Sequence, residues 1–135
     1  MAQIELTWIE KQRFVGVDGS GHSVVLSPGN DVGVRPSDTL LIALAACASV
    51  DIVEILRKQR AQLERLSARV SGQQADEAPW AYQRIHLHFV VTAGGVGQAQ
   101  LDRAVDLALN KYCSVRASLA PNIQVTFEAE LHASP

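Results

Sequence analysis

Two cysteines are the residues of this sequence best suited to covalent chemistry. Cys47 lies in the apolar run "LLIALAACASV" (residues 40–50), and Cys113 ends the segment "AVDLALNKYC". Cysteine reacts as the thiolate, which a nearby cation or a helix N-terminus favours and which apolar burial disfavours. Free cysteine is also among the most buried residue types. Each cysteine is therefore open to two interpretations, as a redox residue or as a small residue of the core.

The activation of Cys47 must come from another part of the fold. Its position, about three turns into a predicted helix, is too far from the N-terminus for much help from the helix dipole. Asp51, four residues later on the same helix face, would oppose ionisation of the thiol. Cys113 is expected to be the more exposed cysteine, and the alternative is that it packs under Tyr112. The arginines near apolar segments that are candidates to supply a cation are Arg13, Arg35 and Arg116.

A second group with possible chemistry is the pair His86 and His88, which share one face of a predicted strand. This spacing can hold two ligands of a metal ion, but a metal site needs further ligands. The other histidines are His22 and His132, and no cysteine or carboxylate cluster adjoins the pair in the sequence. We therefore favour a solvated strand face, and we expect neither a metal nor another cofactor.

Hydrophobic periodicity predicts the elements that position these residues. The turn "DGSG" followed by "HSVVLS" predicts a hairpin near the start of the chain. Residues 35–60 are predicted to form one long helix that begins at Pro36, and apolar residues at helical spacing from Leu101 to Tyr112 predict a second helix. Alternation of apolar and polar residues predicts strands at residues 4–8, 14–17, 66–70, 85–91 and 123–131.

This order of elements predicts an α+β protein whose helices pack on an antiparallel sheet. The first predicted helix is apolar on all sides, and such a helix must be covered on all sides. One modest sheet and one other helix do not supply that cover. We therefore expect a substantial subunit interface and an intertwined homodimer.

Length and charge exclude several classes of partner. The chain has 135 residues and a formal net charge of -2, which fits a single domain over residues 1–135 and gives no electrostatic footprint for nucleic acid or an anionic membrane. The apolar run of residues 40–50 is shorter than the roughly 20 residues of a membrane-spanning helix. The N-terminus lacks the pattern of a secretory signal. We expect a cytoplasmic protein, in which a stable structural disulfide would be uncommon.

Two long segments resemble the OsmC/Ohr superfamily of osmotically inducible and organic hydroperoxide resistance proteins. They are "RPSDTLLIALAACASVDIVEIL" (residues 35–56) and "LDRAVDLALNKYCSVRASLAPNIQVTFEAEL" (residues 101–131). The shared signatures are a Pro-initiated apolar helix that leads to Ala-Ala-Cys, with Cys47 eleven residues after Pro36, and a second cysteine after a later helix. The resemblance extends over nearly the whole chain. It implies a two-layer α+β fold and an intertwined homodimer with two active sites at the interface.

The resemblance also implies thiol-dependent reduction of organic hydroperoxides. Cys47 would be the peroxidatic residue that is oxidised to a sulfenic acid, and Cys113 would be the resolving residue that condenses with it into a disulfide. A small or protein-bound dithiol would restore the pair. Well-studied members activate the thiolate with an arginine from the N-terminal strands and a glutamate at the start of the helix. Here Arg13 is the candidate arginine, and Asp38 is the carboxylate nearest to the expected position of the glutamate.

The sequence departs from the family pattern at two places. Ser37 follows Pro36 where the glutamate is expected, and "KYCSVRAS" lacks the Cys-Pro pair of the hydroperoxide resistance branch. These differences indicate a divergent OsmC-like subgroup. The leading hypothesis is a thiol peroxidase. The alternative, motivated by the missing glutamate and by Asp51, is a non-catalytic dimeric OsmC-like protein that binds a small apolar ligand at the dimer interface.

Overall fold

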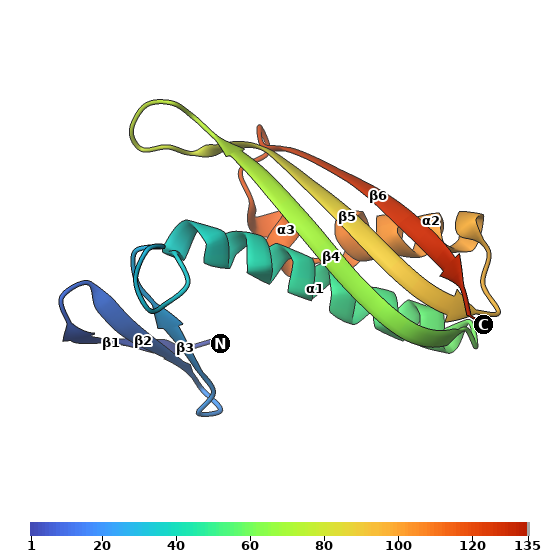
Figure 1. The fold of residues 1–135 in the computed structure, drawn as a ribbon, viewed down its shortest axis with the longest axis horizontal. Helices are drawn as coiled ribbons and strands as arrows, with labels where there is room; N and C mark the ends of the chain where they lie inside the picture. Colours follow the sequence, from blue (N-terminus) through green and yellow to red (C-terminus); the bar gives the residue numbers. More distant parts are fainter. Residues whose placement is uncertain (135) are drawn as a thin grey trace. The chain divides into compact units, whose positions relative to one another are not determined.

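The computed structural model describes residues 1–134, which form two compact units on either side of Leu40. The first unit contains a small sheet, and the second contains a larger sheet with helices (Figure 1). Whether these units fold independently is a separate question, so the single domain expected over residues 1–135 stays a prediction.

The first unit is an antiparallel sheet of three strands in the order β1-β2-β3. The strands are β1 (Ile4–Glu10), β2 (Arg13–Asp18) and β3 (Ser23–Leu26). The predicted hairpin is present, because the Asp18 carboxylate accepts hydrogen bonds of 2.9 Å from the backbone N–H groups of Ser20 and His22 and so closes the turn. The loop after β3 folds back on the strand, where Gly33 allows a close approach: a Cβ there would lie 2.8 Å from the Val25 carbonyl oxygen.

The predicted long helix is α1 (Pro36–Lys58). Proline suits the first turn of a helix because its missing N–H is not needed there. The residues that α1 buries in the core recur every four positions and form one stripe: Leu44, Ala48, Ile52 and Leu56. The opposite side is uncovered, with Ile42, Val50 and Val53 between 42% and 69% exposed. α1 is long and apolar enough to cross a membrane, but the core helix of a soluble protein meets the same criteria of length and composition.

The second unit contains a sheet of three strands in the order β4-β5-β6. The strands are β4 (Gln62–Gln74), β5 (Tyr82–Gly94) and β6 (Gln124–Ala133). β4 and β5 form the expected antiparallel pair, but β5 and β6 are parallel, from Arg84 opposite Gln124 to Ala93 opposite Ala133. The prediction of an antiparallel sheet is wrong for this one pair. The reason is that a helical crossover, rather than a tight turn, joins β5 to β6.

The crossover contains three helical segments: α2 (Gln98–Leu107), a π-helix η1 (Ala108–Tyr112) and α3 (Ser114–Ser118). The predicted second helix is therefore α-helical only as far as Leu107. A π-helix bonds residue i to i+5, so each residue turns the chain through a smaller angle than in an α-helix. The apolar stripe consequently drifts: Tyr112 is 56% exposed, whereas Cys113 is buried at 3% exposure.

The core of the second unit lies between the sheet and the helices α1 and α2, which cover the same face of the sheet in Figure 1. Alternate residues of β5 point into it, as the period of two predicts: Ile85, Leu87, Phe89 and Val91 are at most 1% exposed. They pack with the buried stripe of α1 and with Leu101, Ala104 and Val105 of α2. This packing fixes the part of α1 that carries Cys47 against the crossover that carries Cys113.

Candidate thiol site

Cys47 lies in the middle of α1 and faces the junction between η1 and α3. Its Sγ is 3.8 Å from the Ser114 hydroxyl oxygen. The cysteine is partly buried, and it packs against the edge of the core rather than at its centre. The sulfur is therefore held by the fold while it remains within reach of solvent.

Cys113 joins η1 to α3 and is the N-cap residue of α3. Its backbone is extended, and its Sγ accepts a hydrogen bond of 3.3 Å from the backbone N–H of Arg116. At 3% exposure it is the more buried cysteine. The expectation that Cys113 would be the more exposed of the two is therefore wrong, because the π-helix rotates it toward the core.

The two cysteines interact, and the pKa values of their thiols are shifted in opposite directions. The pKa of the Cys47 thiol is lowered from its ordinary value, chiefly by the backbone N–H of Val115 and further by the side chains of Cys113 and Ser114, although burial acts in the other direction. Burial raises the pKa of the Cys113 thiol, and the neighbouring Cys47 raises it further, although the Arg116 N–H opposes this. Cys47 is therefore the thiol of the pair that ionises first.

Asp51 is not among the groups with the largest effect on the Cys47 thiol. It is partly exposed and lines a surface hollow with Glu54, Lys58 and Tyr112. The groups with the largest effect on the Cys47 thiol belong instead to residues 113–115. Sequence reasoning missed Ser114, and the available signal was its hydroxyl group directly after Cys113.

The other two predicted site residues, Arg13 and Asp38, lie in the first unit, where each forms an ion pair. The Arg13 guanidinium donates to both carboxylate oxygens of Asp31 at 2.8 Å and to Glu10 at 2.8 Å. This pairing holds the pKa of Asp31 below its usual value. Asp38 accepts a hydrogen bond of 2.8 Å from Arg35, three residues earlier. The catalytic roles of Arg13 and Asp38 stay predictions.

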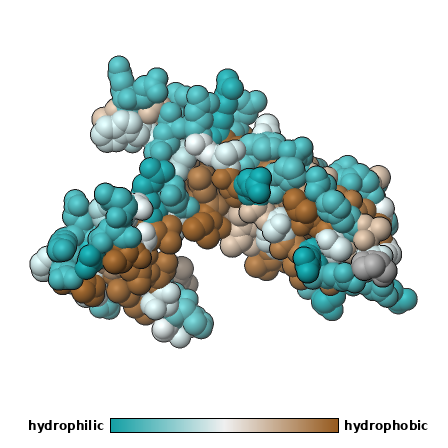
Figure 2. Space-filling model, in the orientation of Figure 1, coloured by the Kyte–Doolittle hydropathy of each residue, from teal (hydrophilic) through white to brown (hydrophobic). Residues whose placement is uncertain are grey.

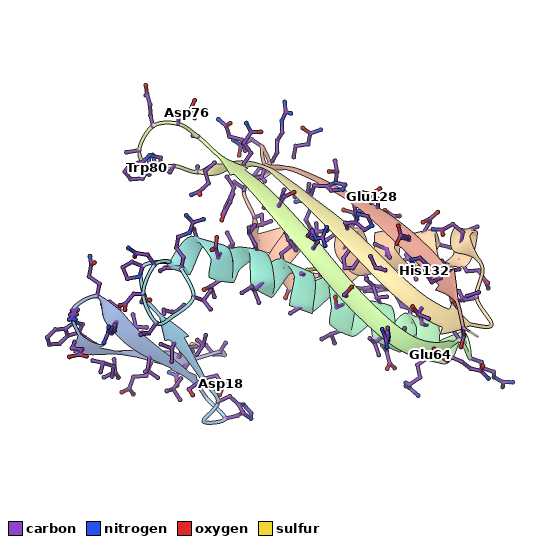
Figure 3. All side chains as sticks on the ribbon, viewed as in Figure 1. Asp18, Glu64, Asp76, Trp80, Glu128 and His132 are labelled. Carbon is purple, nitrogen blue, oxygen red and sulfur yellow. The ribbon has the colours of Figure 1, made fainter. Side chains whose placement is uncertain are left out.

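His86 and His88 lie on the outer face of the larger sheet, opposite the helices. His88 Nδ1 is 3.0 Å from Glu128 Oε1, and His86 Nε2 is 3.4 Å from the same oxygen. On the same strand as Glu128, His132 pairs with Glu130 at 2.7 Å, and the labels of Glu128 and His132 in Figure 3 mark this row along β6. Within residues 1–134, no group of three or more such side chains is arranged to hold a metal ion.

An α+β fold with a long Pro-initiated helix, whose cysteine meets a second cysteine on the crossover, is the arrangement of the OsmC-like proteins. The chain belongs to this family, because the family model described as "OsmC-like protein" matches residues 28–128. Protein YhfA of Escherichia coli strain K12 is 32% identical over 133 residues, which is 98% of this chain and 99% of YhfA. The family predicted from the sequence is therefore confirmed.

Solved structures share the fold along the whole chain. A hypothetical protein from Aquifex aeolicus VF5 superposes with a TM-score of 0.90 at 25% identity, over 100% of this chain and 98% of that one. An organic hydroperoxide resistance protein OsmC from Legionella pneumophila, described as a predicted redox protein, superposes with a TM-score of 0.70 at 15% identity, over 96% of each chain. The predicted α+β fold class is confirmed.

Proposed function

We propose that this protein is a thiol-dependent peroxidase that reduces organic hydroperoxides with Cys47 and Cys113. Membership of the OsmC-like family supports a redox or hydroperoxide-related function. The observation that carries the proposal is the meeting of the two thiols: Cys47 has a lowered pKa, and Cys113 interacts with it directly. A lowered pKa increases the thiolate fraction at neutral pH, and the thiolate is the nucleophile.

The proposed reaction uses each cysteine once. The Cys47 thiolate attacks the terminal peroxide oxygen, an S–O bond forms as the O–O bond breaks, and the alkoxide leaves and takes up a proton to give the alcohol. Cys47 is then a sulfenic acid. Cys113 attacks the Cys47 sulfur, the S–S bond forms as the S–O bond breaks, and hydroxide leaves with the Cys113 proton as water. A small or protein-bound dithiol then reduces the disulfide by exchange.

The different environments of the cysteines fit these two roles. Cys47 is partly exposed, so a hydroperoxide can reach its sulfur. Cys113 is 3% exposed and its pKa is raised, so it stays protonated and protected until Cys47 is oxidised. A resolving thiol needs to meet only its partner, not the substrate. This order makes Cys47 the residue that reacts first.

We further propose that the protein acts as a cytoplasmic homodimer. The support is the uncovered side of α1, where Ile42, Val50 and Val53 lie at 55%, 69% and 42% exposure. Contiguous exposed apolar side chains of this kind mark interaction surfaces. A second copy of the chain would cover them, as the apolar character of the helix on all sides requires.

The direct test is the intact mass of the protein before and after treatment with cumene hydroperoxide. Reduced wild-type protein is expected to lose two hydrogens as the disulfide forms, while the hydroperoxide is converted to its alcohol. Cys47→Ser should consume no peroxide. Cys113→Ser should complete one turnover and hold a sulfenic acid on Cys47 that dimedone traps. Wild-type protein whose mass does not change under excess hydroperoxide would contradict the proposal.

Variants that remove one charge test the roles proposed for Arg13 and Asp38. If they activate the thiolate, Arg13→Ala should slow peroxide consumption at neutral pH and raise the pKa of Cys47 because a cation is lost, and Asp38→Asn should slow peroxide consumption. Asp31→Asn is the matched control, because it removes one of the two ion-pair partners of Arg13 and keeps both the cation and the pair with Glu10. Unchanged peroxide kinetics in Arg13→Ala and Asp38→Asn would remove these residues from the site.

A second candidate function is the binding of a small apolar ligand, which a hollow on the first unit favours. The hollow has a volume of about 360 Å³ and lies over the sheet, a size in the usual range for ligand pockets. Figure 2 shows apolar side chains gathered over this unit. The apolar residues that line it are Ile4, Leu6, Val17, Val24 and Leu26.

Fluorescence of an apolar dye separates the two candidates. If the protein is a binding protein, Leu6→Asp should abolish dye binding and Cys47→Ser should leave it unchanged, while wild-type protein consumes no hydroperoxide. Val32→Asp is a matched control, because Val32 is also exposed in the first unit but does not line the hollow. Dye binding that is lost equally in both aspartate variants would reject a specific pocket.

A further inference from the structure

The Ser114 hydroxyl contacts the sulfur atom that is expected to react. Ser114 Oγ lies 3.8 Å from Cys47 Sγ, on the residue that directly follows Cys113. The carbonyl oxygen of Ser114 has a different partner, since it accepts a hydrogen bond of 2.8 Å from the Ser118 hydroxyl. The turn that begins α3 therefore holds the Ser114 backbone in place and leaves its hydroxyl directed at Cys47.

We propose that the Ser114 hydroxyl donates a hydrogen bond to the Cys47 thiolate and that Ser114 is a positioning residue that increases the reactivity of this cysteine. A thiolate carries no proton, so Cys47 can only accept in this contact, and the hydroxyl must donate. Donation to the charged form favours that form over the neutral thiol. The inference deepens the proposed peroxidase and rests on it only for its effect on peroxide consumption.

The surroundings of Cys47 support this assignment. The groups with the largest effect in lowering its pKa are the backbone N–H groups of Ser114 and Val115 and the side chains of Cys113 and Ser114. Two of these are backbone groups, which no substitution other than proline removes. Cys113 is the proposed resolving residue, so its removal alters the reaction as well as the pKa. Ser114 is the one side chain of this set that can be changed while both thiols remain.

The exposure of Ser114 also suits a role beside a reacting sulfur. Ser114 is exposed, while Cys113 next to it is buried. A substrate can therefore approach Cys47 on the side where the hydroxyl lies. A short polar side chain at this position stabilises negative charge on sulfur without closing the approach, which a charged or aromatic side chain would obstruct.

The experiment measures the pKa of Cys47 in the full-length protein from the pH dependence of its alkylation by iodoacetamide, with the Cys47 peptide quantified by mass spectrometry. Ser114→Ala and Ser114→Gly should both raise this pKa and slow alkylation at pH 7 by about threefold to tenfold, since one pKa unit is a tenfold change in thiolate fraction. Ser114→Thr keeps the hydroxyl and should restore wild-type behaviour. Ser67→Ala, an exposed serine on β4, is the matched control and should change nothing.

A Cys47 pKa that stays the same in both Ser114→Ala and Ser114→Gly would overturn the inference, as would a Ser114→Thr variant that behaves like Ser114→Ala. The same proteins are assayed with cumene hydroperoxide across pH. Loss of peroxide consumption at pH 7 that recovers at high pH supports the inference in full. If wild-type protein consumes no peroxide but the Ser114 variants still shift the pKa, the inference stands and the proposed peroxidase fails.

Discussion

At the residue scale, the site is defined by two thiols that differ in acidity although they interact. Cys47 contacts the Ser114 hydroxyl, has a lowered pKa and is partly buried, whereas Cys113 is enclosed by the core. Because the thiolate is the reactive form, this difference assigns an order to the two cysteines. The assignment does not need a charged side chain beside either sulfur.

The difference in acidity predicts the order of chemical modification. As pH rises, Cys47 should become reactive toward alkylation at a pH below the pKa of a free thiol, which is about 8.5. Cys113 should become reactive only above that pH. The sign follows from the lowered pKa of Cys47 and the raised pKa of Cys113. Iodoacetamide in limiting amount at neutral pH, followed by peptide mass spectrometry, checks this. Equal labelling of the two native cysteines would contradict it, and urea-unfolded protein, where both should react alike, is the control.

The sequence predicted which cysteines form the candidate site but not how they are arranged. The resemblance to a family named both Cys47 and Cys113, and the structure brings them together. Their relative burial was predicted the wrong way round, because the π-helix cannot be recognised from an apolar stripe that continues in α-helical register to Tyr112. Ser114 was missed since its role depends on where α3 begins relative to α1, which is a property of the folded chain.

At the scale of elements, β4 and β5 are joined by a close contact between a glycine and an aromatic ring as well as by strand pairing. A Cβ placed on Gly72 would lie 2.6 Å from Tyr82 Cε1 and 2.9 Å from its Cδ1. Tyr82 is 8% exposed and belongs to the core. The ring therefore covers the glycine across the hairpin, and the absence of a side chain at position 72 makes this packing possible.

This contact predicts that Gly72→Ala destabilises the protein by about 1–3 kcal/mol, the usual cost of forcing extra atoms into packed structure. Urea unfolding followed by circular dichroism gives the value. Tyr82→Ala alone should also destabilise the protein, but Gly72→Ala in that background should cost little, because the ring is gone. Gly19→Ala is the control, since the nearest atom to its Cβ would be 3.9 Å away. Additive effects of the two changes would show that the ring is not the cause.

The elements themselves were largely predictable from hydrophobic period. The long helix, the strands of both sheets and the helix before the last strand appear where alternation or helical spacing placed them. The direction of β6 was not predictable from its own residues, because alternation is the same in parallel and antiparallel strands. A crossover long enough to hold a helix was the relevant signal, since parallel neighbours require such a connection.

At the scale of the whole molecule, apolar surface remains that one chain does not cover. On α1 the exposed residues Ile42, Val50 and Val53 lie opposite the stripe that packs in the core. The hairpin tip between β4 and β5 exposes Trp80 (57%) beside acidic Asp76 (Figure 3). Burial of apolar surface of this kind favours association, and only the part that exceeds the cost of lost freedom of motion contributes to affinity.

The proposed homodimer predicts a solution mass of twice the 14.6 kDa of one chain. Light scattering coupled to size-exclusion chromatography should report that mass for wild-type protein and the single-chain mass for Ile42→Glu and Val50→Glu. Ser71→Glu, on the polar outer face of the larger sheet, should remain a dimer. A wild-type protein that elutes with the mass of one chain at micromolar concentration would rule out the dimer.

The parallel strand β6 also affects the tendency of the larger sheet to aggregate. It pairs along ten residues with β5, whose inward side chains form the centre of the core. A chain that ends at Leu119 would leave this side of β5 as an open row of unpaired amide and carbonyl groups beside a hydrophobic strand, which is a template for aggregation. Such a truncated protein should scatter light at concentrations where the full chain stays clear. β6 is itself an edge strand, but its exposed residues include Glu128 and Glu130, and charged side chains on an edge disfavour pairing with another chain. It therefore gives the sheet an edge that is less prone to aggregation than β5 would be.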